Sequence, residues 1–273
     1  MTFRADLHCH TTCSDGSLTP VELVRLAKAV GLSGLAITDH DTIDAYQTAR
    51  EEAEKQGILL GSGVEFSSVF KKVSVHILAY DFPINSSTIH TFCARHQERR
   101  IKRNLKILTK LTARKMPVTP EELLRLWPDA KTIGRPHIAK LMIEKGYVSS
   151  IKEAFNLYIG DGKSCFDEGE AFSSEETLSI IHEAGGKAFL AHPHLLDRSD
   201  IVNELLKLPF DGIECHYGKF TPDIEKRWVK LAEKKGLLIS GGSDFHGDDK
   251  QYLALGSSWV NEESFHKIFQ RRA

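Results

Sequence analysis

The sequence predicts an α/β barrel of about seven strands that carries a helical insertion. Apolar, β-rich runs alternate with helical patterns, which is typical of a parallel sheet with helices outside it. Between residues 81 and 160 helical periodicity takes over and no convincing strand appears. Histidine and aspartate recur at two-residue spacing near both ends of the chain. A site built from both ends requires a fold that brings the termini together, as closed barrels do.

Composition is that of an ordinary globular protein. The 273 residues are 41% hydrophobic and 27% charged, which suits one α/β barrel plus an insertion. A net charge of -1 gives no support for a broad nucleic-acid footprint. Five scattered cysteines indicate reduced thiols in a cytosolic protein. Neither a leader peptide nor an 18-residue apolar stretch is present, so we expect a cytoplasmic protein without a membrane segment.

The first predicted strand, residues 3–7, is followed by a helix with clear boundaries. Thr19 and Glu22 match a capping box, and Pro20 between them is favoured at the first helical position. The helical pattern stops at Gly31, a residue that commonly ends helices.

The second predicted strand covers residues 34–38, and Asp41 is a candidate N-cap of a helix that runs to Gly57. The remaining predicted strands cover residues 59–66, 73–80, 187–191, 212–216 and 237–240. Helical stretches precede the later strands, as at residues 174–183 and 222–235.

Residues 85–160 form the predicted insertion, in which apolar side chains recur at helical spacing. Examples are Ile101, Leu105, Leu108 and Leu111, and later Ile138, Leu141 and Met142. We therefore expect a metal-binding barrel made of residues 1–84 and 161–273, interrupted by a helical domain that contributes to substrate binding.

Side chains that are able to bind metal follow most of the predicted strands. His8 and His10 lie two apart in an extended segment, so both imidazoles point to one face. The sixth strand ends in Glu214-Cys215-His216, which offers further candidates. The candidate ligand set is His8, His10, Asp15, His40, Glu65, His76, His192, Asp244 and His246.

A single histidine in a strand is more often a core or surface residue than a ligand. We therefore assign no function to four histidines on predicted helices, namely His90, His96, His182 and His266. The nine candidates differ, because they end successive strands at the edge where barrel enzymes build their active sites. Mixed imidazole and carboxylate donors suit Mn, Fe or Zn. Asp39 and Asp41 are expected to orient ligands, with helix capping as the alternative role of Asp41.

The candidate ligands lie in short motifs. These are Asp6-Leu7-His8-Cys9-His10 with Ser14-Asp15-Gly16, Thr38-Asp39-His40-Asp41, Gly63-Val64-Glu65, His76, Ala191-His192-Pro193 and Gly242-Ser243-Asp244-Phe245-His246. Together they resemble the PHP (polymerase and histidinol phosphatase) superfamily over nearly the whole chain. The resemblance implies a distorted (β/α)7, TIM-like barrel and a site for three divalent metal ions, usually manganese, iron or zinc.

The same resemblance assigns the ligands to three ions, with manganese as the first expectation. The implied sets are His8, His10, Glu65 and Asp244 for one ion, Glu65, His76 and His192 for a second, and Asp15, His40 and His246 for a third. Divalent ions in such a site lower the pKa of bound water and stabilise the attacking and leaving oxygens at phosphorus.

Four further segments are similar to one branch of the family. They are Gln97-Glu98-Arg99-Arg100, Ile133-Gly134-Arg135-Pro136-His137, Lys145-Gly146-Tyr147-Val148 and Gly160-Asp161-Gly162-Lys163. The branch contains short single-chain phosphoesterases that act on nucleoside 3′,5′-bisphosphates and short oligoribonucleotides. This implies a phosphatase that releases the 3′-phosphate to give a nucleoside 5′-monophosphate, with 5′-to-3′ trimming of short RNA as a second activity. We expect a nucleotide or short RNA as substrate, and neither a membrane nor an obligate protein partner.

Arg135 and His137 are candidate substrate contacts, because a helix N-terminus beside a guanidinium favours a phosphate. Lys163, after a Gly-rich turn, and Arg99, on a predicted helix, are further candidates.

Asp244 and His194 are the candidate catalytic residues, and His194 is expected to contact phosphate or to donate a proton to the leaving group. Three other functions remain open. A histidinol-phosphate phosphatase is disfavoured by the Arg-Pro-His segment of the insertion. A C–N hydrolase is disfavoured because Glu65 takes the place of a bridging modified lysine. A non-catalytic module that associates with nucleic acid or a polymerase is disfavoured by the complete ligand set.

Overall fold

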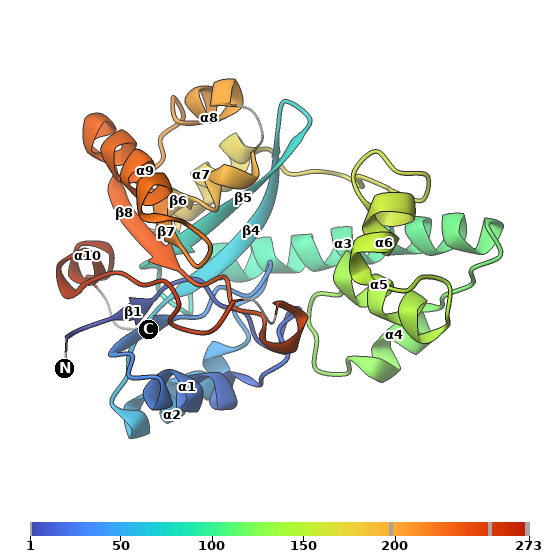
Figure 1. Cartoon of the computed structure of the whole chain (residues 1–273), viewed down its shortest axis with the longest axis horizontal. Coiled ribbons are helices and arrows are strands. Elements are labelled where there is room, and N and C mark those ends of the chain that lie inside the picture. The colour runs from blue at the N-terminus through green and yellow to red at the C-terminus, as the bar shows by residue number, and fades with distance from the viewer. Residues whose placement is uncertain (1, 197–198, 251–252, 271–273) are drawn as a thin grey trace. The chain divides into compact units, whose positions relative to one another are not determined.

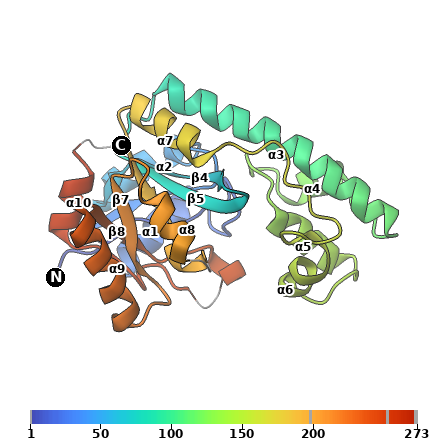
Figure 2. The same ribbon diagram turned by 90° about the horizontal axis from the view of Figure 1, so that it is seen from above.

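The computed structural model describes residues 2–196, 199–250 and 253–270 and divides into two compact units (Figures 1 and 2). The sheet unit comprises Met1–Cys93 and Phe172–Ala273, and the helical unit comprises Ala94–Ala171. The chain passes from one unit to the other after residues 93 and 171, whereas the sequence predicts an insertion over residues 85–160.

The strands of the sheet unit form two sheets. In the first, β1 (Ala5–Asp6), β2 (Gly34–Ala36) and β3 (Leu59–Gly61) are parallel and adjacent in that order. The second has the order β4 (Gly63–Phe70), β5 (Val73–Tyr80), β6 (Lys187–Leu190), β7 (Gly212–Tyr217) and β8 (Leu238–Gly242). Its β5 is antiparallel to both neighbours, whereas β6, β7 and β8 are parallel. The mixed α/β class with parallel strands is confirmed, but the strands of the described ranges form no single closed barrel sheet.

The predicted strand at residues 59–66 is in fact two strands, β3 and β4, that belong to different sheets. Two glycines flank the change of sheet. A Cβ on Gly61 would lie 2.4 Å from the Phe269 ring, and one on Gly63 would lie 3.0 Å from the Ile37 carbonyl oxygen. The chain can pass from the first sheet to the second here because glycine has no Cβ to collide with these close neighbours.

Backbone hydrogen bonds outside the strands connect the two sheets. On one side the Leu7 N–H donates to Gly241 and the Asp244 N–H donates to His8. On the other side the Glu65 N–H donates to the Asp39 carbonyl. These connections bring the segments that follow β1, β2 and β8 close to the first residues of β4.

Six α-helices are described in the remainder of the sheet unit: α1 (Pro20–Ala29), α2 (Tyr46–Gln56), α7 (Ser174–Glu183), α8 (Ser199–Leu205), α9 (Pro222–Lys235) and α10 (Glu262–Ile268). Figure 1 shows α1 and α2 side by side. The capping box of Thr19 and Glu22 before α1 is present. Two 3-10 helices, η2 (Pro193–Leu195) and η3 (Gly247–Lys250), follow β6 and β8.

Asp41 does not cap α2, which corrects the prediction. The helix begins only at Tyr46, and its N-cap Ala45 offers no side-chain acceptor. Asp41 is buried with a positive φ of 57°, and its carboxylate accepts a hydrogen bond from the Ser67 N–H at 2.8 Å. The side chain therefore ties the loop after β2 to strand β4.

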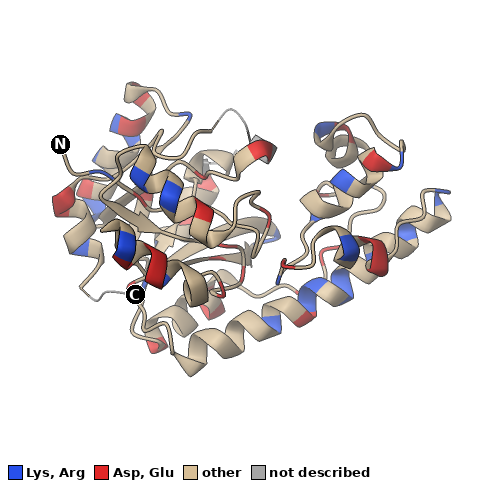
Figure 3. Cartoon of the chain, turned by 90° about the horizontal axis from the view of Figure 1, so that it is seen from below, with Lys and Arg blue, Asp and Glu red and all other residues tan. Residues whose placement is uncertain are grey.

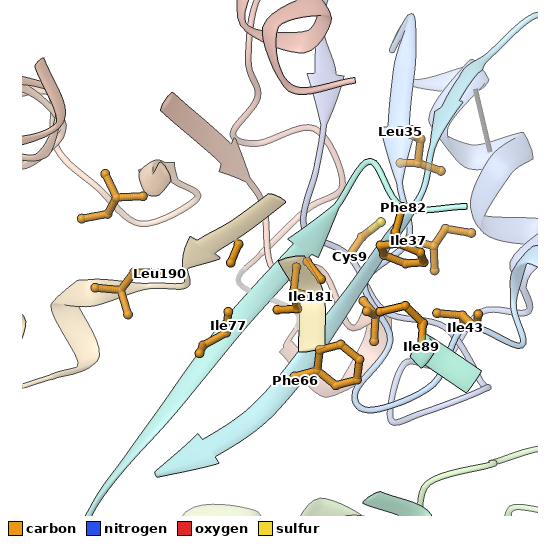
Figure 4. Close-up of a cluster of buried hydrophobic side chains, with 14 of the residues drawn as sticks. Cys9, Leu35, Ile37, Ile43, Phe66, Ile77, Phe82, Ile89, Ile181 and Leu190 are labelled. Carbon is orange, nitrogen blue, oxygen red and sulfur yellow. The ribbon is translucent and has the colours of Figure 1, made fainter. Parts of the chain in front are cut away.

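Buried apolar side chains pack between the strands and helices of the sheet unit (Figure 4). Ile77 and Leu190 are neighbours on β5 and β6, and both are fully buried together with Ile181 of α7. Phe66 of β4 belongs to the same cluster. Close packing of this kind keeps the strand ends in fixed positions.

The helical unit contains most of α3 (Ser87–Ala113), then α4 (Pro120–Leu126), α5 (Arg135–Glu144), α6 (Ile151–Ala154) and the π-helix η1 (Phe155–Ile159). It has an apolar core of its own, to which Ile107, Leu111 and Ile138 contribute. Lys and Arg residues recur along α3 (Figure 3). Within the described ranges, no helix combines the length and apolar character needed to cross a membrane.

Candidate metal centre

The nine predicted ligands come together at one end of the strands. His8 and His10 lie in the segment after β1, Glu65 in β4 and His76 in β5. Short distances connect these residues to the rest of the set, namely Asp15, His40, His192, Asp244 and His246. His8, His10 and Glu65 are almost completely inaccessible to solvent, whereas the side chain of His76 is 28% exposed. The cluster thus has a buried base and an open side.

Glu65 lies at the middle of the cluster and uses both carboxylate oxygens. Its Oε1 lies 2.7 Å from His76 Nδ1 and 2.9 Å from His192 Nε2. Its Oε2 lies 3.2 Å from one ring nitrogen of each of three histidines, His8, His10 and His40. One carboxylate therefore faces five imidazoles, which come from β5 and from the segments that follow β1, β2 and β6.

Asp15 joins a second part of the cluster from the loop after β1. Its carboxylate lies 3.4 Å from His246 Nε2 and 3.8 Å from both His40 Nε2 and His10 Nδ1. The rings of His10 and His246 stack with their centroids 4.0 Å apart. These four side chains can offer donor atoms within 4.8 Å of one another.

Asp244, in the turn after β8, connects the two parts. Its Oδ1 lies 3.4 Å from both His10 Nε2 and His246 Nδ1, and 3.5 Å from His8 Nε2. Its Oδ2 accepts a hydrogen bond from the Tyr217 hydroxyl at 2.8 Å. The backbone at Asp244 has a positive φ of 54°, an uncommon conformation for a residue other than glycine.

Further polar groups surround the cluster. Asp39 accepts hydrogen bonds from the Thr11 N–H, the Thr11 hydroxyl and the Ser14 hydroxyl, at 2.7, 2.6 and 2.6 Å, and so fixes the loop that carries Asp15. Glu214 and Tyr217, both on β7, also contact the cluster. The sequence shows Glu214 at the end of a predicted strand, but it carries no signal for the contact of Tyr217.

Burial and charge oppose each other throughout the cluster. Burial by itself would raise the pKa of the Glu65 carboxyl, but the imidazoles of His40 and His76 hold it well below its usual range. Burial by itself would lower the pKa of the His10 imidazole. The carboxylates of Asp244 and Glu65 outweigh burial and raise this pKa to about 9. At His40 burial dominates and lowers the pKa to about 3. The buried carboxylates thus favour positive charge at His10, whereas His40 favours the neutral form.

Divalent cations fit this arrangement. Both ring nitrogens of His10 are buried, yet within the described part of the chain neither makes a hydrogen bond. Buried polar atoms normally have a hydrogen-bond partner. Buried ring nitrogens without one, in a cluster of imidazoles and carboxylates, indicate a site for a metal ion. The donor types suit Mn, Fe or Zn better than Mg, which prefers oxygen.

His194 lies beside the cluster in an aromatic setting. Its ring centroid is 4.5 Å from that of Tyr217, 4.6 Å from that of Phe220 and 6.4 Å from that of His192. Burial, followed by the charge of the neighbouring His192, lowers the pKa of His194 to about 4. The imidazole is therefore neutral at physiological pH.

The four predicted substrate contacts lie in the helical unit. Arg135 forms an ion pair with Asp161 and donates to the Ile159 carbonyl at 3.2 Å, and its guanidinium lies over the rings of Phe155 and Phe166. This fixes the side chain before any substrate arrives.

The other three predicted contacts differ in exposure. His137 is buried, and its Nδ1 accepts a hydrogen bond from the Gly134 N–H, so its ring caps α5. Lys163 is exposed. Arg99 is partly buried and donates to the Glu168 carbonyl at 3.5 Å.

Comparison with known proteins adds independent findings. A family model for the PHP domain matches residues 6–158. The 5′-3′ exoribonuclease Rnm of Salmonella typhimurium is 35% identical over 248 residues, covering 88% of this chain and 84% of that protein. The 3′,5′-nucleoside bisphosphate phosphatase of Chromobacterium violaceum is 30% identical over 246 residues, covering 88% of this chain and 86% of that protein. The crystal structure of a candidate metal-dependent phosphoesterase from Bifidobacterium adolescentis aligns with a TM-score of 0.87 at 30% identity, covering 98% of this chain and 95% of that one.

Proposed function

The chain belongs to the PHP domain family and is a metal-dependent phosphoesterase, and from this premise we propose that it removes the 3′-phosphate of nucleoside 3′,5′-bisphosphates. The products would be a nucleoside 5′-monophosphate and phosphate. The observation that carries the chemistry is the convergence of five imidazoles on the Glu65 carboxylate, with the Asp244 carboxylate beside His8 and His10.

In the proposed centre three ions are held by the nine clustered side chains. The first set is His8, His10, Glu65 and Asp244, the second Glu65, His76 and His192, and the third Asp15, His40 and His246. Manganese is the proposed metal, with iron or zinc as the alternatives. Divalent ions in such a site lower the pKa of water and offset charge on phosphoryl oxygens.

The chain's own side chains hold the reacting groups in place. Asp244 keeps Oδ1 toward the imidazoles, because its Oδ2 is occupied by the Tyr217 hydroxyl. We propose that Asp244 orients the attacking water through a hydrogen bond. His194, neutral and beside His192, would donate a hydrogen bond to the scissile phosphate.

Recognition of the second phosphate is assigned to the helical unit. Arg135, which opens α5, offers a guanidinium held by Asp161 and by two aromatic rings. A guanidinium at a helix N-terminus suits a phosphate monoester. Arg99, His137 and Lys163 are proposed as further contacts. The 30% identity to a bisphosphate phosphatase over most of both chains supports this substrate.

Trimming of short RNA from its 5′ end is a second candidate function. It is favoured by the higher identity, 35%, to the Salmonella exoribonuclease. Basic side chains along α3 would suit a phosphate backbone.

A substrate panel tests the proposal. With Mn²⁺ present, kcat/KM is compared for adenosine 3′,5′-bisphosphate, a 5′-phosphorylated RNA trimer, histidinol phosphate and p-nitrophenyl phosphate. The bisphosphate should be the best substrate and the two monoesters poor ones, since binding at the 5′-phosphate positions the scissile group. Equal kcat/KM for histidinol phosphate and the bisphosphate would refute the nucleotide assignment, and a clear preference for the trimer would favour the second candidate.

A further inference from the structure

Glu214 is a completely buried carboxylate on β7 beside the metal centre. The pairing of β7 with β8 shifts register between Glu214 and His216, an irregularity that redirects side chains and is common near active sites. The nine-ligand set does not include Glu214, and its role is not explained by packing alone.

The two carboxylate oxygens of Glu214 contact two different candidate ligands. Oε1 lies 2.8 Å from His8 Nδ1, and Oε2 accepts a hydrogen bond from the His192 backbone N–H at 2.6 Å. Both short distances are typical of hydrogen bonds to a charged acceptor. Glu214 thus joins a ligand near the start of the chain to one that follows β6.

The contact with His8 determines which ring nitrogen carries a proton. An ionised carboxylate can only accept hydrogen bonds, so His8 Nδ1 must be protonated to donate to Glu214. The other nitrogen, Nε2, faces Glu65 Oε2 at 3.2 Å and Asp244 Oδ1 at 3.5 Å. A neutral His8 therefore has its unshared electron pair on Nε2, directed toward the centre of the cluster.

The contact with His192 stabilises an unusual backbone. His192 has φ 26° and ψ 60°, in the positive-φ range that residues other than glycine rarely adopt. Its ring nitrogen Nε2 lies 2.9 Å from Glu65 Oε1, so the position of this backbone sets the position of the ring. The hydrogen bond from the His192 N–H to Glu214 helps to offset the strain.

We propose that Glu214 is a positioning residue of the metal centre, which keeps the His8 proton on Nδ1 and holds the His192 backbone in place. The inference rests on the metal centre assigned above. It predicts that metal affinity depends on a carboxylate that does not itself bind the ion, as is common for groups that orient ligating histidines.

The substitution Glu214→Gln tests this with almost no change in shape. A glutamine amide has one acceptor and one donor end. If the amide oxygen accepts the hydrogen bond from the His192 N–H, the amide NH₂ faces His8 Nδ1. An NH₂ group can only donate, so His8 Nδ1 must then accept. The ring proton of neutral His8 therefore moves to Nε2. Affinity for Mn²⁺, measured by competition with a chromophoric chelator, should fall about 10–100-fold.

The proton position is measured without metal or substrate. Long-range ¹H–¹⁵N spectra of the metal-free protein, with His8 assigned from its loss in His8→Gln, report which ring nitrogen is protonated. As pH is raised, the wild-type ring should lose a proton from Nε2 and keep the one on Nδ1, whereas the Glu214→Gln ring should lose it from Nδ1 and keep the one on Nε2.

Asp6→Asn is the matched control. Asp6 is also a buried carboxylate, and it accepts hydrogen bonds from the backbone N–H groups of His8, Ser243 and Gly256, but it does not contact the His8 ring. This variant should leave the His8 proton on Nδ1.

Two outcomes would overturn the proposal. One is an unprotonated His8 Nδ1 in wild type, and the other is a Glu214→Gln variant in which both the Mn²⁺ affinity and the His8 tautomer are unchanged. If Glu214→Gln does not fold, the wild-type spectrum still decides it. Failure of wild type to bind any divalent ion would instead contradict the metal centre, and the metal-free spectra keep the two results separate.

Discussion

His10 and Asp244 come from opposite ends of the chain, and His10 Nε2 lies 3.4 Å from Asp244 Oδ1. This contact forms only when the segments after β1 and β8 are both in place, and the Asp244 N–H to His8 carbonyl bond at 2.7 Å joins the same two segments. Binding of metal to such a site is therefore linked to folding of the whole sheet unit.

Removal of metal should abolish hydrolysis and lower stability together. A bound ion neutralises carboxylates that are otherwise buried close to one another, and Mn²⁺ at about 100 times its Kd adds about 2.7 kcal/mol to the free energy of unfolding. We expect chelator-treated protein to lose phosphatase activity and to unfold several degrees lower, with Mn²⁺ restoring both better than Mg²⁺ does. Full activity in excess chelator, with elemental analysis showing no bound metal, would contradict this.

Glu65→Gln should damage the centre more than any change outside it. The carboxylate faces five imidazoles, and the neutral amide provides only one acceptor oxygen. We expect kcat/KM to fall more than the about 100-fold typical of a group that only orients ligands, with a parallel loss of bound Mn²⁺. Glu225→Gln, which changes a carboxylate 3.3 Å from His216 Nδ1, is the control and should retain its metal. Normal metal content in Glu65→Gln would show that the centre is misassigned.

Arg135→Ala should affect substrates with two phosphates selectively. Loss of a charge-assisted hydrogen bond to the 5′-phosphate should cost about 1.5–3 kcal/mol in kcat/KM on adenosine 3′,5′-bisphosphate. p-Nitrophenyl phosphate has no second phosphate, so its hydrolysis should hardly change. Asp161→Asn, which removes the carboxylate partner of Arg135 but keeps the guanidinium, should retain most activity on both. Equal losses on both substrates in Arg135→Ala would mean that the residue serves folding or the scissile phosphate.

His194 should act without changing its charge between about pH 5 and pH 9, because burial lowers its pKa to about 4. His194→Gln should therefore lower kcat/KM by a similar factor across this range, leaving the shape of the profile intact. A pH limb present in wild type and missing in the variant would contradict the neutral role.

The same pKa makes a prediction about stability. Between pH 4 and 6.5 the unfolded chain binds a proton at His194 that the folded chain does not, so this residue makes the free energy of unfolding fall as pH decreases through that window. In urea unfolding of the metal-free protein, His194→Gln should show a smaller decrease in stability from pH 6.5 to pH 4 than wild type. An identical pH slope would argue against the lowered pKa.

The spacing of polar residues at strand ends predicted much of the fold and grouped the candidate ligands. The sequence alone identifies the two-residue spacing of His8 and His10 and the position of Glu65 in an apolar run. This is possible because strand periodicity depends only on residues close together in the chain. The structure places all nine predicted side chains in one cluster.

Long-range geometry was not predictable in this way. The division of residues 59–66 between two sheets depends on the close approach of Phe269 to Gly61, which no local pattern records. Asp41 matched a helix cap by residue type, but its carboxylate binds Ser67 in another strand. Tyr217 contacts Asp244 because β7 pairs with β8. From the sequence alone, a tyrosine in an apolar strand would be assigned to the hydrophobic core.

Product analysis tests the central claim most directly. Wild-type protein is incubated with adenosine 3′,5′-bisphosphate and Mn²⁺, with and without excess chelator, and the nucleotides are separated chromatographically. We expect adenosine 5′-monophosphate and one equivalent of phosphate, formed only when the metal is available. Formation of adenosine 3′-monophosphate, or turnover that persists undiminished in the chelator, would contradict it.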